Sequence, residues 1–307
     1  MLLISSPSFQ TKLESLLSVT PKAFGGVAST VSLLSRPRLF RYSFDDASTE
    51  DFTTYADGCL GVTMNGDLEI DIVVSQGAKP VGPTYRVVAA EGSTIRAMRA
   101  ESDANSQVPT DESKRVAVPR PPLAEANYLL KKVLSDDDAA FMKKTLLIGV
   151  ENTCLAPNHD CPSYSVFEVV SAGAKDGSAT LPLGCVDLTG GERIRFFVRE
   201  TLFAQEEVHS NLQKYCQNTQ RTHELSGCLM LPTLDRGTNL LGSKPGFESS
   251  SICESLPRIP SISGFFNNGV IVPRQKSLAG ASEKSVIHGS GTCLVFFRSS
   301  KFCIQLD

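Results

Sequence analysis

The residues best suited to hold a small polar molecule lie in the last third of the chain. Arg236 and Gly237 follow a predicted strand, where a guanidinium can bind a carboxylate through paired hydrogen bonds. Asn267 and Asn268 offer side-chain amides, and the imidazole of His288 can donate to a ligand. We interpret these five residues as a candidate ligand-binding set. Each residue also has a purely structural interpretation. Arg236 can be an exposed loop arginine, the asparagines before Gly269 can form a turn, and His288 can be a hydrogen-bonded histidine of the fold.

Two other groups of residues are weaker candidates for a functional site. The loop from Cys154 to Cys161 holds residue types that ligate zinc, but no second Cys or His pair with suitable spacing follows it. A polar surface loop with incidental thiols is therefore the preferred interpretation. His288 precedes Cys293 by five residues, yet nothing predicts a helix N-terminus that would lower the thiol pKa. The sequence predicts a protein that is not an enzyme, without catalytic residues, metal or cofactor.

Composition excludes several classes of protein. The chain has 307 residues, 41% of them hydrophobic and 21% charged, which is typical of a globular protein able to bury a core. The formal charge is -3 and the basic residues do not cluster on one predicted element, so we expect no nucleic-acid partner. No apolar stretch reaches the roughly 20 residues that a membrane-spanning helix needs, so we expect no membrane span.

The cysteines and the first residues bear on the compartment. Nine cysteines are scattered without the dense spacing of a secreted scaffold, which favours a reducing, cytoplasmic environment. Residues Met1 to Phe24 are rich in serine and poor in acidic residues, as in an organelle transit peptide. Leu13, Leu16 and Leu17 have helical spacing and precede Pro21, so a helix of the domain explains them equally well. Organelle targeting thus remains open.

Turn and strand patterns dominate the first third of the chain. Gly25-Gly26 indicates a loop. The apolar runs 59–64 and 68–74 flank Asn65-Gly66-Asp67, which predicts a β-hairpin. Residues 75–83, rich in glycine and proline, are expected to interrupt the strands before another begins at Tyr85.

Strands and helices alternate in the remainder. A helix is predicted from Leu123 to Leu134 and another over Leu202–Cys216, where apolar residues recur on one face. A second short helix is expected from Ser135 or Asp136. Strands are predicted at 39–44, 145–150, 164–171, 193–199, 228–231 and 293–298. We predict an α+β fold of mixed, largely antiparallel sheets covered by helices, in two pseudo-domains: residues 1–110 and 123–307, joined by a linker at 111–122.

These motifs, taken in order, resemble those of FIST-domain proteins. Residues 73–77 with 79–83 and then 90–92 are similar to the strand, glycine-proline turn and strand of that family, and residues 25–29 resemble the small-residue segment before them. Residues 147–150, 191–200, 262–269 and 287–289 resemble successive segments of its C-terminal part. The resemblance spans most of residues 25–298. It also leads us to expect that the strands which normally precede Gly25 are missing.

The resemblance implies a sensory module of intracellular signal transduction that binds a small polar ligand such as an amino acid. Two departures bear on the ligand. The family usually has a cysteine and an asparagine just before its Arg-Gly pair, where this chain reads Pro232-Thr233-Leu234-Asp235 and departs at Thr233 and Leu234. It also usually has a glutamate and a second glycine where this chain has Val270 and Val272. The alternative is a substrate-binding scaffold of an F-box ubiquitin-ligase adapter without a functional pocket. We expect protein partners, either ubiquitin-ligase subunits or signalling proteins.

Overall fold

The computed structural model divides into two compact units that are each built from separate stretches of chain. Unit 1 comprises Met1–Gly77, Thr201–Gln275 and Ala281–Asp307, and unit 2 comprises Ala78–Glu200 and Lys276–Gly280. The structure describes residues 1–9, 12–13, 17, 23–29, 36–44, 50–101, 118–133, 146–151, 164–169, 171–172, 175–181, 188–218, 225–241, 245–273 and 285–298.

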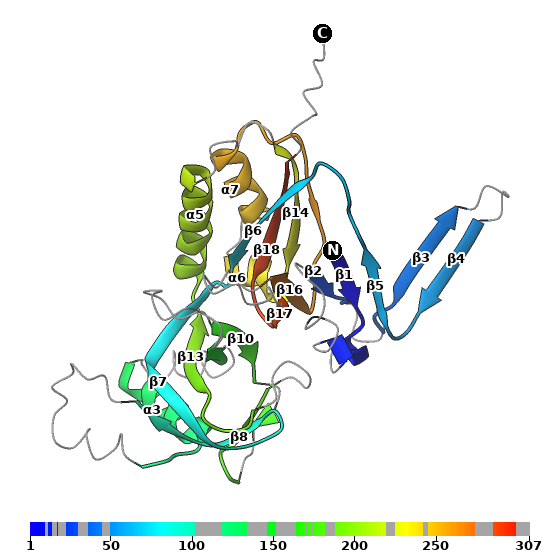
Figure 1. The fold of residues 1–307 in the computed structure, drawn as a ribbon. Coiled ribbons are helices and arrows are strands. Elements are labelled where there is room, and N and C mark those ends of the chain that lie inside the picture. Colours follow the sequence, from blue (N-terminus) through cyan, green and yellow to red (C-terminus); the bar gives the residue numbers. More distant parts are fainter. Residues whose placement is uncertain are drawn as a thin grey trace. The chain divides into compact units, whose positions relative to one another are not determined.

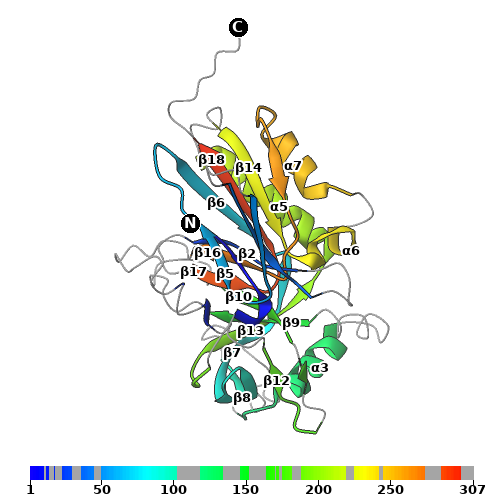
Figure 2. The same cartoon turned by 90° about the vertical axis from the view of Figure 1, so that its right-hand side faces the viewer.

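Unit 1 contains three of the sheets formed by the described residues (Figures 1 and 2). A five-stranded sheet has the order β17-β16-β2-β1-β5, with bounds Ser285–His288, Gly269–Pro273, Phe24–Val27, Leu2–Ser5 and Cys59–Val62. A four-stranded sheet has the order β15-β14-β18-β6, with bounds Ile262–Gly264, Leu225–Pro232, Thr292–Arg298 and Glu69–Ser75. A separate two-stranded ribbon pairs β3 (Leu39–Phe44) with β4 (Glu50–Tyr55).

Strand β18 contributes side chains to apolar clusters on both faces of the four-stranded sheet. Successive side chains of a strand point to opposite faces. Leu294 and Phe296 pack into a cluster with residues of the helices α5 (Thr201–Asn218) and α7 (Phe247–Ser255). Cys293 and Val295 pack into a second cluster with residues of β2 and β16 in the five-stranded sheet. The four-stranded sheet therefore lies between a helical layer and the other sheet.

The first strands differ from the expectation. Gly25-Gly26 was expected to form a loop, but both residues lie in β2, which pairs in parallel with β1 and antiparallel with β16. A Cβ on Gly25 would lie 1.7 Å from the carbonyl oxygen of Leu3, so glycine is needed here for close packing of the backbones. The strand β1 also corrects the expectation that no strand precedes Gly25. Between the two strands, Leu13 and Leu17 are helical and buried, as their spacing predicts.

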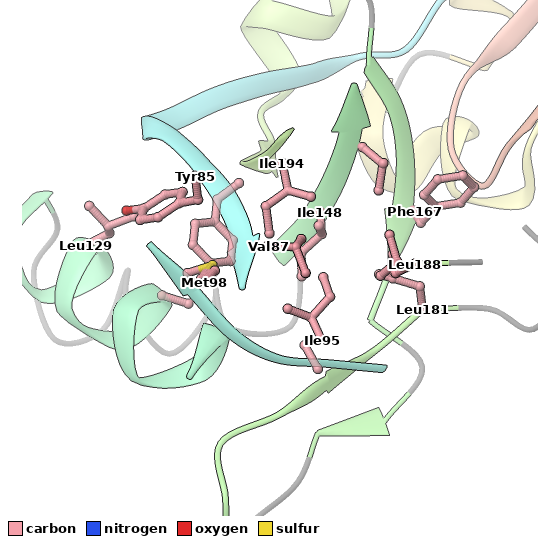
Figure 3. Packing of buried hydrophobic residues seen from close by; sticks show 14 residues of the cluster. Tyr85, Val87, Ile95, Met98, Leu129, Ile148, Phe167, Leu181, Leu188 and Ile194 are labelled. Atoms are coloured by element: carbon pink, nitrogen blue, oxygen red, sulfur yellow. The ribbon is translucent and has the colours of Figure 1, made fainter. Parts of the chain in front are cut away.

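Unit 2 is built on a seven-stranded antiparallel sheet of order β10-β9-β13-β7-β8-β12-β11. The bounds are Tyr164–Glu168, Leu146–Glu151, Arg193–Arg199, Ala78–Glu91, Thr94–Ala100, Ala179–Thr180 and Ser171–Ala172. The helix α3 (Pro122–Val133) contributes Ala126 and Leu129 to the largest apolar cluster of the unit. Figure 3 shows Leu129 near Tyr85 and Met98, with Ile148 and Ile194 on the neighbouring strands.

Two predicted local structures are wrong. The runs 59–64 and 68–74 do not form a hairpin, because β5 pairs with β1 and β6 pairs with β18 in a different sheet. Residues 75–83 were expected to interrupt the strands, yet β7 begins at Ala78 and continues through both prolines. The register with β13 passes from Ile194–Tyr85 to Phe196–Val81, so a bulge accommodates Pro83 and its missing N–H.

The predicted fold class is confirmed: the described chain forms mixed, largely antiparallel sheets with helices packed on them. The strands at β9 and β13 and the helices α3 and α5 also agree with the sequence. Part of the predicted linker and the short helix expected at Ser135 or Asp136 lie outside the described residues. The division into domains at 111–122 stays a prediction. None of the helices that the structure describes is long and apolar enough to cross a membrane.

Candidate functional site

Arg236 is the centre of a buried polar cluster in unit 1. It ends the short 3₁₀ helix η3 (Leu234–Arg236) that follows β14, and its side chain is fully buried. Nη2 lies 2.7 Å from Oε1 of Glu248 on α7, and Nε donates to the same oxygen and to Oγ1 of Thr292 on β18. Thr292 in turn donates to that carboxylate at 2.6 Å. The charge of Arg236 is thus matched inside the protein by Glu248.

The end of β6 joins this cluster to α5. Ser75 Oγ accepts from Nη2 of Arg236 at 3.2 Å and donates to Oε2 of Glu207 at 2.8 Å. The same Glu207 oxygen accepts from the backbone N–H of Gly77 at 2.5 Å. One carboxylate therefore fixes both a side chain and the backbone at the point where the chain leaves β6.

Gly77 is required at this point for two reasons. Its φ is +65°, a left-handed conformation that glycine adopts without steric cost. A Cβ there would lie 1.8 Å from Nη1 of Arg236. Nη1 has no hydrogen-bond partner among the described residues, although the other two nitrogens of the guanidinium are bonded. The glycine thus leaves space for one unpaired edge of the guanidinium.

His288 lies beside this cluster, at the end of β17. The side-chain amide nitrogen of Gln76 lies 3.1 Å from Nδ1 of His288. Because an amide nitrogen donates, Nδ1 accepts and the proton of the neutral imidazole is on Nε2. Burial lowers the pKa of His288 from its usual value to about 4, since the interior disfavours the charged form. The ring is therefore neutral at physiological pH.

The two asparagines of the candidate set have different environments. Asn267 is fully buried, and its Nδ2 donates to the carbonyl of Phe265 at 2.9 Å. Its Oδ1 has no partner among the described residues and lies 1.9 Å from where a Cβ on Gly26 would be. Asn268 is exposed, and its Nδ2 donates to the carbonyl of Ala28 at 3.2 Å.

The turn between β17 and β18 is tied to the segment that carries Arg236. Thr233 accepts from the backbone N–H of Gly291 at 2.9 Å, and Asp235 accepts from Ser290 at 2.6 Å. Thr233 also forms an isolated parallel bridge with Asn267. Polar contacts therefore link the loops at 233–237, 265–268 and 290–292.

All five predicted site residues lie in unit 1. Arg236 and His288 contact consecutive residues, Ser75 and Gln76. Gly237 follows Arg236, and a Cβ on it would meet the ring of Phe266 at 3.9 Å, next to Asn267. The structure thus brings the set together, while its role in binding stays a prediction.

Sequence reasoning missed the partners of this set. Ser75, Gln76, Glu207, Glu248 and Thr292 come from β6, the residue after it, α5, α7 and β18. The hydroxyl, amide and carboxyl groups of these residues look like ordinary surface chemistry in the sequence. A usable signal was Gly77, because a glycine between two strand-like runs indicates either a turn or a close approach.

The two weaker candidate sites, Cys293 with His288 and the loop from Cys154 to Cys161, have less support. Cys293 is buried in the apolar cluster that includes Val295 and Val270, and burial raises the pKa of its thiol. It lies in the four-stranded sheet, whereas His288 lies in the five-stranded sheet. The whole loop from Cys154 to Cys161 lies outside the described residues. In the described part of the chain, His, Cys, Asp and Glu do not gather in groups of three that suit a metal.

Comparison with known proteins finds a family match over the first third of the chain. Residues 4–101 match the model of the FIST N domain. Uncharacterized proteins of Mycobacterium bovis and Mycobacterium tuberculosis are each 25% identical to this chain over 275 residues. These matches cover 89% of this chain but 59% of each relative. The chain therefore spans about three fifths of the length of these relatives.

Proposed function

From the FIST N domain that this chain carries at residues 4–101, we propose a regulatory, sensory role in intracellular signal transduction, exerted by binding a small polar ligand such as an amino acid. The observation that carries the proposal is the convergence of polar groups from several elements on Gln76 and Gly77. The free cysteines of the described residues, Cys59, Cys216, Cys228, Cys253 and Cys293, fit a reducing compartment.

The residues of the cluster differ in burial and in pairing, and we assign them different roles accordingly. Arg236 is fully buried and already paired with Glu248, so we place it in the wall of the site rather than on the ligand. Asn267 is fully buried and holds the loop beside it. Gln76 is half-buried and Asn268 is exposed, whereas His288 is buried and holds the side chain of Gln76 through Nδ1. We propose that Gln76 and Asn268 contact the ligand and that His288 positions Gln76.

A ligand panel tests this proposal. We expect some of the amino acids and small carboxylates to raise the melting temperature of the full chain, because a ligand that binds only the folded state stabilises it by about 2.7 kcal/mol at a hundred times Kd. Gln76→Ala and Asn268→Ala should abolish the shift. Gln213→Ala, which truncates an exposed amide on α5, is the matched control and should keep it. A folded chain that responds to no member of the panel would contradict the proposal.

The alternative function is a protein-interaction scaffold, as in an F-box ubiquitin-ligase adapter. The pairing of Arg236 with Glu248 favours this alternative, because the positive charge of Arg236 is already balanced by a buried carboxylate and does not need a ligand carboxylate. Leu234, Phe265 and Phe266 are also exposed apolar side chains close to the cluster. This alternative predicts that purified ubiquitin-ligase subunits bind the chain directly, with no effect of the ligand panel. Absence of binding to those subunits would count against it.

A further inference from the structure

Arg195 on β13 differs from the other partly or fully buried arginines that the structure describes. Each of the others has a carboxylate partner: Arg120, Arg193, Arg199, Arg236 and Arg298. Arg195 is half-buried, and its Nε donates to the carbonyl of Gly82 at 3.1 Å. Its Nη1 and Nη2 have no hydrogen-bond partner, and its charge has no carboxylate partner, among the described residues. The guanidinium is therefore held in place with its charge unpaired.

The strands on either side of Arg195 explain why its charge is unpaired. Gly149 lies directly opposite Arg195 on β9 and has no side chain. On the other side, the bulge of β7 places residues 82–84 opposite Arg195, and these are glycine, proline and threonine. The hydrogen bond to Gly82 fixes Nε at this bulge. Neither neighbouring strand therefore offers a carboxylate at the level of Arg195.

The other charges close to Arg195 balance one another. Alternation along β13 puts Arg193 and Arg195 on the same face of the seven-stranded sheet. Arg193 donates to Glu101 and to Glu151, each at 2.8 Å, and Arg86 donates to Glu101 at 2.8 Å. These two arginines and two glutamates carry no net charge together. Arg195 therefore gives this part of the face one unmatched positive charge.

Two more distant arginines of this face leave the local balance unchanged. Arg199 is paired with Glu168. Arg99 lies opposite Arg86 on β8 and is exposed. Because β8 is two strands away from β13, at about 4.8 Å per strand, Arg99 is roughly 10 Å or more from Arg195, beyond a Debye length at physiological salt.

The uncharged groups around Arg195 also favour an anion. Thr84, in the bulge of β7, has a hydroxyl that lies 3.4 Å from the hydroxyl of Tyr164. The ring of Tyr164 contacts that of Phe197, two residues beyond Arg195, with centroids 5.6 Å apart. Both aromatic side chains are buried, so one side of this region is apolar. Attraction between opposite charges is stronger beside apolar groups than in water.

A planar ligand with a single negative charge suits these groups. Nη1 and Nη2 of a guanidinium offer parallel N–H groups that match the two oxygens of a carboxylate. One carboxylate also cancels the one unmatched charge. A phosphate dianion would leave an excess negative charge on the face that carries Glu101 and Glu151.

We propose that Arg195 anchors a site in unit 2 that binds a small organic carboxylate. The carboxylate oxygens accept hydrogen bonds from Nη1 and Nη2, and the hydroxyl of Thr84 donates a further one. Arg195 and Thr84 belong to unit 2, whereas Gln76 and the polar cluster at Arg236 belong to unit 1. This site is therefore separate from the one under the proposed function.

The test is saturation-transfer NMR on the methyl signal of acetate with the full chain, near neutral pH and at constant ionic strength. We expect saturable binding to the wild type and affinity about tenfold lower or less in Arg195→Gln, because the charged hydrogen bonds are lost. Arg195→Lys should also bind weakly, since lysine keeps the charge but not the paired donors. Arg99→Gln, which removes an exposed arginine of the same face, is the matched control and should bind as the wild type does.

Three outcomes would overturn the proposal. Equal acetate affinity in Arg195→Gln and the wild type would exclude Arg195 as the anchor. Displacement of acetate by an equal concentration of chloride would show unspecific attraction only. Tighter binding of inorganic phosphate than of acetate would make a dianion the occupant.

Further variants keep the test valid and separate the two proposed sites. Thr84→Val should weaken acetate binding without removing the arginine, so the proposal remains testable if Arg195→Gln does not fold. The part of the acetate signal that depends on Arg195 should persist in Gln76→Ala. Thermal shifts that depend on Gln76 should likewise persist in Arg195→Gln, so that failure of one site is visible independently of the other.

Discussion

Arg236 and Glu248 form an ion pair with Nη2 2.7 Å from Oε1, and both side chains are buried. Thr292 and Ser75 accept further hydrogen bonds from Nε and Nη2 of Arg236. A buried pair of this kind gains its attraction only if both charges are present, because each charge has lost its hydration. Its importance therefore appears when one partner is removed alone.

Glu248→Ala should lower the free energy of unfolding by about 3–5 kcal/mol, since it leaves the Arg236 guanidinium charged, buried and unpaired. The measurement is urea unfolding of the full chain. Glu254→Ala removes an exposed carboxylate from the same helix and should leave the midpoint unchanged. The double variant Arg236→Met/Glu248→Leu should recover most of the loss. A single variant as stable as the wild type would contradict the assignment of a buried pair.

Gly77→Ala should destabilise unit 1 by more than Gly92→Ala destabilises unit 2. Both glycines have left-handed φ values, +65° and +57°, so an alanine costs about 1–2 kcal/mol at either position. Only at Gly77 does the added Cβ collide with another group, at 1.8 Å from Nη1 of Arg236, whereas around Gly92 the space is open. Urea midpoints of the two variants provide the comparison. Equal losses would show that the guanidinium moves aside freely.

The stability of the chain should fall as pH falls from about 6.5 to about 4, partly because of His288. The folded-state pKa of His288 lies below the unfolded value, so in this window the unfolded state binds the proton and the folded state does not. The contribution is about 3 kcal/mol over the full window.

His288→Gln removes this contribution because glutamine does not titrate. The readout is the difference between wild type and variant in urea midpoint at pH 7.5 and pH 4.5, since carboxylates titrate in both proteins. His209→Gln, an exposed histidine of α5, serves as the control and should keep the wild-type slope. An unchanged slope in His288→Gln would mean that the imidazole is protonated in the folded chain.

Cys253 should react with iodoacetamide in the native chain much faster than Cys293. Cys253 is exposed on α7, whereas Cys293 is fully buried and burial raises the pKa of its thiol. Peptide mass spectrometry after short labelling, with and without urea, measures both rates. Rapid native labelling of Cys293 would contradict the burial of this thiol and would favour the weaker alternative of a cysteine hydrolase that uses His288.

The sequence predicts best those elements whose residues carry a regular pattern of their own. The helix α5 follows from the spacing of Ala204, Val208, Leu212 and Tyr215, all of which are buried in the structure. Strand β13 spans the predicted residues 193–199. In these segments the local pattern and the tertiary burial agree, so neither overrides the other.

Glycine and proline account for the largest errors. Gly25-Gly26 indicates a loop by composition, but tight packing against Leu3 and Asn267 requires small residues in a strand. Pro83 indicates a break in the chain, but a bulge in β7 accommodates it. The partners of Arg236 could not be predicted from the sequence, because the pairing of β6 with β18 is what places Ser75 and Thr292 beside it. Such contacts are set by topology, which local pattern does not contain.

The pairing of the strands has a consequence for any attempt to produce the segment that matches the FIST N domain alone. Within residues 4–101, β2 pairs with β16, β6 with β18, and β7 with β13, and all three partners lie beyond residue 190. A ribosome must therefore pass residue 199 before β7 gains β13, and residue 298 before β6 gains all of β18. Excised at the borders of the sequence match, the segment would carry three unsatisfied strand edges and should aggregate rather than fold.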